Sequence, residues 1–580
     1  MEGRARSLRI RACSLEDLRG KGRILVTHGG RVIALFYHEG RVYAFDNRCP
    51  HMGFPLIRGT VSNGILTCDW HHARFDLESG CTLDLWADDA ARYDVEIVDG
   101  DVWVVVEDRR EDDSTILGRL RRGLEHGIML LVAKALTSMI YEDRDLGAVY
   151  RVALDWYASR DVSWGGGGVF LSALNNIRGY LGREDLLMGL LRGLDIVSRE
   201  ARREPPRPSL EPLAGDSPPY ERVKSWVRWL AEVRDGDALE RLLASMAKWG
   251  YSIDMIEEAF FEAATEHYLS DGHSVDFANK AFELARSLGY LDSGVLRSLA
   301  PLLAEASRYE EDHEWRHPVD LVALVEEESG RLAEVFQAGG DPVSPSRVAS
   351  LVLGGEPRGI VRGLTGLLER GADPRHISLG VALAAARRVA MFSKYNDLED
   401  WIRVLHSLSY ANAIHQVVRR VPTPRVFRGV YHAALRVYLD RFLNEPPYRI
   451  PKGSPGGSRE RLLESLLEAL DKRYMVEEAA GIVADYLASG YEEEHLVRTL
   501  GHAVLREDAD FHTVQMLEAG TRLLEELGSP EDRRTVFIAM ARYIASQSPT
   551  QRRLRQIAQI ALKLHRGEHI YEERQTVVKD

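Results

Sequence analysis

This chain of 580 residues has few cysteines, no concentrated basic stripe and no apolar segment near Met1. Only four cysteines occur, too few for a disulfide scaffold of this length, so we expect a reducing, cytoplasmic location. The net charge of −13, without a concentrated basic stripe, argues against nucleic acid as a partner. The stretch Met1–Arg11 is basic and polar, unlike a signal peptide.

The chain also lacks the run of about 20 uninterrupted apolar residues that a membrane span requires. The nearest approach, Ile128–Ile140, is broken by Lys134 and predicts a buried helix. Four consecutive glycines, Gly165–Gly168, lack the Gly-x-Gly-x-x-Gly spacing of a dinucleotide site and indicate a turn before a helix. There is no phosphate-binding loop and no Gly-x-Ser-x-Gly elbow. We therefore expect neither a membrane anchor nor hydride transfer from a bound NAD(P)H.

Two of the four cysteines stand beside histidines in a pattern that indicates metal binding. Cys49-Pro-His51 is a Cys-x-His pair, and Cys68-Asp-Trp-His71 is a Cys-x-x-His pair. Two thiolates and two imidazoles form the ligand set of a [2Fe-2S] cluster in which histidines replace two cysteines on one iron. The same residues could bind zinc, but zinc sites more often use symmetric Cys-x-x-Cys knuckles, so the asymmetric spacing favours the iron cluster.

Residues 8–106 resemble the Rieske [2Fe-2S] domain family beyond the four candidate ligands. The segment Cys49–Leu56 is similar to the first Rieske loop, Cys68–His71 to the second, and Arg74–Gly80 to the turn that closes the domain. By this resemblance the two cysteines hold the inner iron and the two histidines hold the outer, more exposed iron. The resemblance covers less than a fifth of the chain.

Departures from the family pattern indicate its low-potential class, the Rieske ferredoxins and oxygenases. The high-potential proteins of respiratory complexes carry an extra cysteine in each loop, where this chain has Phe54 and Trp70. Their serine and tyrosine hydroxyls near the cluster sulfurs are replaced by Ala73 and Phe75. Fewer hydrogen bonds to the sulfurs leave negative charge less stabilised, so we expect a lower reduction potential.

Two further departures concern the surroundings of the cluster. His72 replaces a glycine that is usual after the second histidine ligand, and we expect an exposed side chain there rather than an electron relay. The family's proline-bearing cover loop is not evident in Leu83–Asp88. Cys13 and Cys81 fall outside the motif and are expected to be structural.

The remaining pattern of residues 8–106 predicts a small antiparallel β barrel or sandwich. Short alternating runs are separated by turn signals rich in glycine and aspartate, as in hairpins. The clearest predicted strands are Arg23–Thr27, Val32–Tyr37, Val42–Phe45, Ile65–Cys68, Tyr93–Val98 and Val102–Val106. A hydrophilic linker, residues 107–113, follows.

From Ser114 almost to Leu564 the apolar residues recur with the helical period, so we predict a large all-α part without a further sheet. A Gly-Tyr pair at Gly250 and again at Gly490, and a Glu-Pro-Pro triplet at Glu204 and again at Glu445, recur at the same spacing to within one residue. Chance is one explanation. We favour an internal duplication that stacks helical hairpins.

The duplication divides the helical part into three segments. Helical unit 1 is predicted at 114–310, a connecting segment at 311–354 and helical unit 2 at 355–570.

Histidines of the helical part could bind a second metal ion, for example a non-haem iron. Six stand on predicted apolar helices: His126, His406, His415, His432, His502 and His512. His502 and His512 flank Asp508, so a histidine–carboxylate site is chemically feasible there. The alternatives are that each buried histidine bonds a backbone carbonyl in the core, and that Asp508 and Asp510 cap the next helix.

A second, weaker pattern of possible iron ligands is Glu310-Glu-Asp312-His313 with His317, near Asp320. The two histidines could share one helical face. Pro318 follows at once and the neighbours are highly charged, so a solvated helix start is the favoured interpretation.

The sequence therefore predicts a Rieske-type oxidoreductase or electron-transfer protein. We expect an external reductase or ferredoxin to donate single electrons, and the cluster to pass them to a site in the helical part. A non-haem iron there would activate oxygen on a small organic substrate. The alternative is a non-catalytic electron carrier whose helical solenoid is a protein-docking scaffold.

Overall fold

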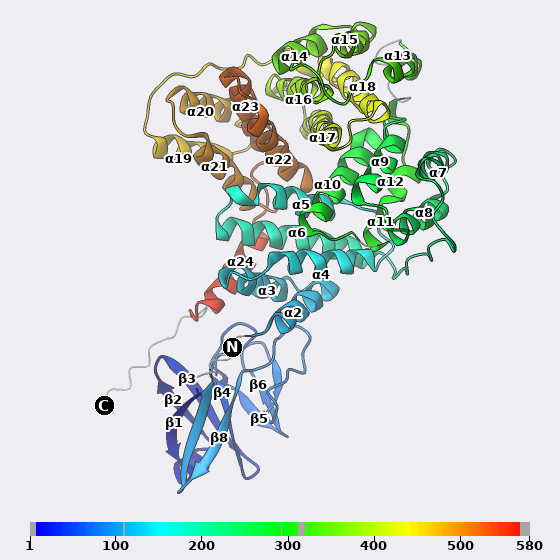
Figure 1. The fold of residues 1–580 in the computed structure, drawn as a ribbon. Coiled ribbons are helices and arrows are strands. Elements are labelled where there is room, and N and C mark those ends of the chain that lie inside the picture. Colours follow the sequence, from blue (N-terminus) through cyan, green and yellow to red (C-terminus); the bar gives the residue numbers. More distant parts are fainter. Residues whose placement is uncertain (1–6, 108–110, 292, 311–318, 569–580) are drawn as a thin grey trace. The chain divides into compact units, whose positions relative to one another are not determined.

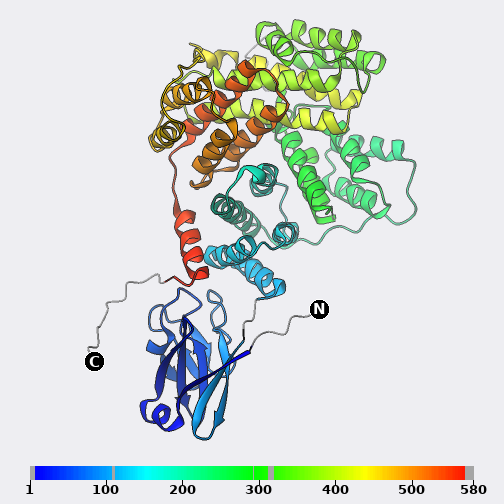
Figure 2. The ribbon, with the colours of Figure 1, turned by 60° about the vertical axis from the view of Figure 1, so that its left-hand side comes forward.

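The computed structural model describes residues 7–107, 111–291, 293–310 and 319–568, and the chain forms two compact units. The first unit is Met1–Val152 together with Leu554–Asp580, and the second is Ala153–Arg553. Strands lie in the N-terminal region and helices make up most of the rest (Figure 1, Figure 2). A small β domain followed by a large helical region was the predicted fold class, and it is confirmed.

The β domain consists of a six-stranded and a three-stranded antiparallel sheet, in the orders β1-β9-β8-β4-β3-β2 and β5-β6-β7. All six strands predicted above are confirmed to within one residue at each end. A short helix, α1 (Leu15–Lys21), was not predicted. The strands are β1 (Ser7–Ser14), β2 (Arg23–His28), β3 (Arg31–His38), β4 (Arg41–Asp46), β5 (Thr60–Ser62), β6 (Ile65–Thr67), β7 (Arg74–Asp76), β8 (Arg92–Val98) and β9 (Asp101–Glu107).

Four hairpins of this domain close with two-residue turns in which both residues have positive φ. The turns are Gly29-Gly30, Glu39-Gly40, Asn63-Gly64 and Asp99-Gly100. Such turns match the right-handed twist of the flanking strands, and they fix the register of each hairpin. Strand β3 is buried on both faces, because Ile33 enters one hydrophobic core and Ala34 enters the other.

The first unit extends beyond the β domain to α2 (Asp113–His126), α3 (Met129–Tyr141) and α24 (Arg553–His565). Arg119 of α2 and Lys134 of α3 both contact the carboxylate of Asp88 in the β domain. The apolar run broken by Lys134 is therefore a buried helix, as predicted. The domain boundaries given above stay predictions, and the compact units divide the chain at other positions.

The second unit begins inside the helix Leu146–Ala158 and is built from helices. No described helix of the chain is both long and apolar enough to cross a membrane. The helices from its start onward are α4 (Leu146–Ala158), α5 (Gly166–Ile177), α6 (Arg183–Arg203), α7 (Tyr220–Glu232), α8 (Gly236–Lys248), α9 (Ile253–Ala264), α10 (His273–Leu288), α11 (Ser293–Leu299), α12 (Pro301–Ala304), α13 (Leu321–Val335), α14 (Pro345–Gly354), α15 (Pro357–Glu369), α16 (Pro374–Ala390), α17 (Leu398–Arg420), α18 (Pro424–Leu439), α19 (Arg459–Leu470), α20 (Val476–Ala488), α21 (Glu493–Leu505), α22 (Phe511–Glu526) and α23 (Pro530–Gln547).

The glycine run Gly165–Gly168 differs from its prediction as a turn, because α5 begins inside it. A side chain would not fit here. A Cβ atom on Gly167 would lie 2.8 Å from the backbone nitrogen of Val197, and one on Gly168 would lie 2.7 Å from the ring of Trp164. The glycines therefore allow close packing of α5 rather than flexibility.

The predicted duplication has local support at its Gly-Tyr landmarks. Gly250 and Gly490 both have left-handed backbone conformations, with φ of 80° and 75°. The hydroxyl of Tyr251 donates to the carbonyl of Pro218 over 2.9 Å, and that of Tyr491 donates to the carbonyl of Gly457 over 2.8 Å. Each tyrosine thus ties the start of a helix to the loop that precedes the helix pair before it. The duplication as a whole stays a prediction.

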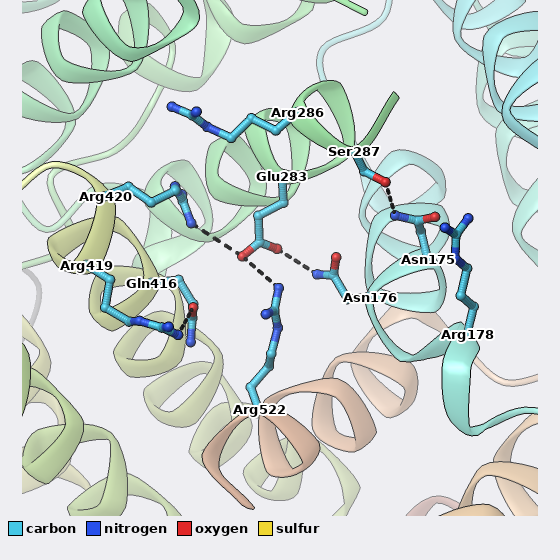
Figure 3. A pocket seen from close by; sticks show the side chains of 10 residues that line it. All are labelled: Asn175, Asn176, Arg178, Glu283, Arg286, Ser287, Gln416, Arg419, Arg420 and Arg522. Carbon is cyan, nitrogen blue, oxygen red and sulfur yellow. Dashed lines mark hydrogen bonds and ion pairs between the residues drawn. The ribbon is translucent and has the colours of Figure 1, made fainter. Parts of the chain in front are cut away.

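A buried ion cluster joins four helices of the second unit. The ammonium of Lys280 on α10 is 3.0 Å from the carboxylate of Glu283 and 2.8 Å from that of Glu518 on α22, and its side chain is 1% exposed. Asn176 of α5 donates to both glutamates. Arg420 of α17 lies 3.6 Å from Glu283. Figure 3 shows Asn176, Arg420 and Arg522 pointing toward Glu283 from three sides.

Replacing the buried cation tests the importance of this cluster. Lys280→Met leaves Glu283 and Glu518 buried without their ammonium, so we expect a loss of about 3–5 kcal/mol in the free energy of unfolding. The midpoint of the helical circular-dichroism transition in urea measures it. Lys394→Met is the control, because Lys394 pairs with Glu477 at the surface and its loss should shift the midpoint little. Equal shifts for the two variants would contradict the prediction.

Candidate functional site

Two loops of the β domain carry the four predicted cluster ligands and share one backbone plan. In the first loop, the N–H of Cys49 donates to the carbonyl of Phe54, and the N–H of Gly53 donates to the carbonyl of Cys49. In the second loop, which joins β6 to β7, the N–H of Cys68 donates to the carbonyl of Ala73, and that of His72 to the carbonyl of Cys68. Each cysteine therefore stands at the start of an equivalent turn.

The equivalent turns explain the conformation of His72. It occupies the position that Gly53 occupies in the first loop, and φ is positive at both, 79° for Gly53 and 64° for His72. A left-handed backbone costs a residue with a side chain about 1–2 kcal/mol, which accounts for the glycine usual at this place. The side chain of His72 is exposed, as predicted.

The two cysteines lie together inside a hydrophobic core. Cys49 is 2% exposed and Cys68 is 1% exposed, among aromatic neighbours that include Phe45 and Phe75. The thiol of Cys49 donates to the sulfur of Cys68, and this hydrogen bond lowers the pKa of the Cys68 thiol to about 6. The backbone N–H groups of Trp70 and His71 also favour the Cys68 thiolate. This is the ionised form that binds a metal.

The two histidines meet edge to face at the outer side of the cysteines. Their ring centroids are 4.9 Å apart at 85°. Burial lowers the pKa of His51 to about 4, helped by the charge of Lys134, so its imidazole is neutral. The Nδ1 atom of His51 is buried, and none of the described residues forms a hydrogen bond with it. His71 is exposed. One histidine is therefore half-buried and the other faces solvent.

These residues fit a [2Fe-2S] cluster. Cys49 and Cys68 would hold one iron, and His51 and His71 the other, with the unpartnered Nδ1 atom of His51 free to ligate. Such a cluster exchanges one electron at a time. The chain's own contribution is to exclude water from the sulfurs and to keep the imidazole of His51 neutral.

A segment without the family's proline covers the histidine side. The ring of Trp86 packs edge to face on His51, with centroids 4.6 Å apart. Asp84 fixes this segment to the second loop's hairpin, because its carboxylate accepts from the backbone N–H of Arg74 over 2.8 Å and from the guanidinium over 2.7 Å. Arg74 in turn holds the pKa of Asp84 below its ordinary value. Trp86 thus shields the cluster site in place of the missing cover loop.

A buried cation lies behind the first loop. The ammonium of Lys134 contacts the carbonyl of Pro50 and stands 3.2 Å from the carboxylate of Asp88. The guanidinium of Arg119 donates to the other oxygen of that carboxylate over 2.6 Å. These groups border a cavity of about 360 Å³ that also touches Cys49. Sequence reasoning missed this feature, since Lys134 appeared there only as an interruption of an apolar run.

Comparison with known proteins agrees with this geometry. The Rieske [2Fe-2S] domain family matches residues 9–92. The chain is 32% identical over 100 residues to the 3-phenylpropionate/cinnamic acid dioxygenase ferredoxin subunit of Photorhabdus laumondii, which covers 17% of this chain and 94% of that protein. The chain belongs to the Rieske [2Fe-2S] domain family. Its predicted membership is confirmed, and we refer to the β domain as the Rieske domain.

Two other similar proteins also match this chain over a short segment only. The chain is 34% identical over 68 residues to apoptosis-inducing factor 3 of Mus musculus, and it spans only 11% of that protein's length and 12% of its own. A solved complex of reduced oxygenase and oxidized ferredoxin in carbazole 1,9a-dioxygenase matches with 22% identity and a TM-score of 0.17, over 18% of this chain and 97% of that one. Each of these matches covers less than a fifth of the chain.

The structure places the histidine candidates of the helical part in different surroundings. His512 lies beside His406, and the Nε2 atoms of the two rings are 3.1 Å apart. His502 instead pairs with Asp185 over 2.7 Å. Asp508 accepts from the backbone N–H of Arg553 over 3.2 Å. The described residues thus do not combine His502 and Asp508 with His512 in one metal-binding group.

None of the other candidates belongs to a group of three close metal-binding side chains among the described residues. His415 bonds the hydroxyl of Ser378 and the carboxylate of Glu526. His126 ends α2, and His432 is buried in α18. Asp320 caps α13 and Glu310 bonds His267 over 2.8 Å. Asp312, His313 and His317 lie outside the described residues.

The arginine-rich cavity beside the ion cluster is not an evident anion site. Its volume is about 490 Å³, and five arginines line it (Figure 3): Arg178, Arg286, Arg419, Arg420 and Arg522. Four of them already pair with glutamates, as Arg419 does with Glu526 over 2.9 Å and Arg420 with Glu257 over 2.7 Å. Their charge is therefore largely compensated within the protein.

The left-handed conformation of His72 gives a test of the loop geometry. His72→Gly should stabilise the Rieske domain by about 1 kcal/mol, because glycine adopts positive φ without a steric cost. His72→Ala is the matched control, since it removes the imidazole but keeps a Cβ atom. The temperature at which the cluster's visible absorption is lost measures the effect. A glycine variant no more stable than the alanine variant would refute the equivalence of the loops.

Proposed function

We propose that this chain is a Rieske-type oxidoreductase that receives single electrons from an external reductase or ferredoxin and passes them to a site in its helical part. The convergence of two buried thiols and two imidazoles, one with an unpartnered Nδ1 atom, carries the proposal. His71 and Trp70 present an exposed edge at which a donor protein could exchange electrons. The absence of a recognisable dinucleotide motif supports an external donor.

The size of the helical part supports a task beyond carrying electrons. The 100 matched residues make up 94% of the related ferredoxin subunit, so a Rieske domain needs no further chain to hold its cluster. That relative serves a dioxygenase by its name. We therefore propose that the helical part oxidises a small organic substrate at a non-haem iron. If no such iron is found, the alternative is favoured, in which the chain is an electron carrier and the helical part is a protein-docking scaffold.

The cluster is tested by electron paramagnetic resonance on the full chain after anaerobic reconstitution and reduction. We expect the low average g-value of a cluster with mixed sulfur and nitrogen ligands. Cys68→Ser should lose this signal. Cys81→Ser is the matched control, because Cys81 is an exposed free cysteine outside both loops, and it should keep the signal. A colourless wild-type protein would end the proposal.

The buried cation behind the first loop gives a prediction on the reduction potential. We expect a midpoint clearly below that of respiratory Rieske proteins, because Ala73 and Phe75 offer no hydroxyl to the sulfurs. Lys134→Met should lower it further, by roughly some tens of millivolts, since removal of a nearby positive charge disfavours the added electron. Lys134→Arg keeps the charge and should keep the potential. Protein-film voltammetry measures each midpoint, and a rise in the methionine variant would contradict the assignment.

A further inference from the structure

Three helices of the second unit bring three histidines together. His273 begins α10, His406 lies in α17 and His512 lies in the first turn of α22. One ring nitrogen from each falls within 4.8 Å of the others. Among the described residues this is the one group of three or more histidine, cysteine or acidic side chains with such spacing. We call it the histidine cluster.

Hydrogen bonds on the outer side of the cluster fix how each imidazole is protonated. The Nδ1 atom of His406 bonds the carboxylate of Asp271 over 2.9 Å, and that of His512 bonds the carboxylate of Asp510 over 3.0 Å. The Nδ1 atom of His273 bonds the carbonyl of Ser270 over 2.9 Å. Carboxylates and carbonyls only accept, so each Nδ1 atom carries a proton and each Nε2 atom presents a lone pair.

The three Nε2 atoms, which face one another, therefore carry no hydrogen. The Nε2 atoms of His406 and His512 are 3.1 Å apart, and two lone pairs at this distance repel unless a cation or an added proton lies between them. The Nε2 atom of His273 is buried and has no hydrogen-bond partner in the described part of the chain. Two nitrogens bound to one ion at 2.0–2.1 Å would be about 3.0–3.4 Å apart, which includes the observed distance.

We propose that His273, His406 and His512 bind one first-row transition-metal ion through their Nε2 atoms. Three imidazoles suit zinc, iron, copper or nickel and leave coordination positions open. Carboxylate and carbonyl groups on the outer nitrogens are the arrangement that orients metal-binding histidines in other proteins.

The backbone beside the cluster is held in an unusual conformation that supports this arrangement. Ser270 and Asp271 have φ of 48° and 51°, and φ of Gly272 is 92°. A Cβ atom on Gly272 would lie 2.9 Å from the ring of Tyr410. Asp271 is also 3.2 Å from the guanidinium of Arg436. The backbone at Gly272 is therefore closely packed, and the carboxylate that orients His406 is also held by Arg436. Strained segments are often found at functional sites.

A cavity borders the histidine cluster and indicates the class of substrate. Its volume is about 470 Å³, within the range of small-molecule sites. All three histidines line it, together with the aromatic rings of Trp164, Phe277 and Phe511 and the apolar Leu302. Glu305 is its one lining carboxylate among the described residues. A small, flat, largely apolar molecule fits these walls and would reach the open positions of the ion.

Metal binding at the histidine cluster extends the proposed function. It can be tested even if the proposed function is wrong. If both hold, the ion is iron and the Rieske cluster supplies its electrons. If the Rieske cluster fails to form, the histidines should still bind a metal ion. The two inferences can therefore fail separately.

The test counts metal in the full chain. The protein is stripped with a chelator, its Rieske cluster is rebuilt, and Fe²⁺ is added as the probe in slight excess before desalting. Mass spectrometry should find one iron per chain beyond the two of the cluster. His406→Ala should lose that extra iron. His502→Ala is the matched control, because His502 bonds Asp185 outside the cluster, and it should keep the iron.

A spectroscopic readout separates a specific site from loosely held iron. Nitric oxide added to the ferrous protein should give the high-spin iron–nitrosyl signal in wild type and in His502→Ala, and lose it in His406→Ala. Asp271→Asn should weaken iron affinity about 10- to 100-fold while the chain stays folded. It serves as the second variant if His406→Ala does not fold by circular dichroism.

Two outcomes would overturn the proposal. Wild-type chain that retains neither Fe²⁺ nor Zn²⁺ beyond the cluster's iron would show that His406 and His512 share a proton instead. Extra iron that survives both His406→Ala and Asp271→Asn would place the ion elsewhere. The Cys68→Ser chain, which cannot form the Rieske cluster, should still bind one Fe²⁺.

Discussion

The burial of Lys280 between Glu283 and Glu518 fixes the helices that carry the proposed metal site of the second unit. A buried ammonium cannot be left without its carboxylates, so α10 and α22 cannot slide past each other without a large loss of stability. His273 precedes Lys280 on α10, and His512 precedes Glu518 on α22, each by about two turns. The ion cluster therefore sets the register of the two helices, and that register brings the two histidines together.

The first unit also contains a buried carboxylate paired with cations, close to the first of its two predicted ligand loops. Asp88 accepts from Arg119 and Lys134, which come from two helices outside the Rieske domain. Lys134 also contacts the carbonyl of Pro50, which lies between the predicted ligands Cys49 and His51. A helix outside the Rieske domain thus supplies a positive charge to this loop. The extra helices give this chain a further means of setting the electrostatic environment of its cluster.

Local sequence pattern was enough to predict the Rieske domain but not the histidine cluster. The four predicted cluster ligands lie on two turns whose spacing is fixed by backbone hydrogen bonds, so the spacing is visible in the sequence. His273 and His512 are brought together by packing between distant helices, which no short motif records. Proximity in sequence instead suggested His502 as the partner of His512. They stand on successive helices, α21 and α22, and point to different partners.

The charge balance of the histidine cluster argues for a divalent ion there. Three neutral imidazoles bring no charge, yet two of them bond the carboxylates of Asp271 and Asp510. Arg436 compensates part of the charge of Asp271. A divalent cation between the Nε2 atoms would satisfy three lone pairs and balance the remaining negative charge at once, whereas a proton could satisfy only one pair of nitrogens. Because His273 would still lack a partner in that second case, the geometry favours the metal ion over a shared proton.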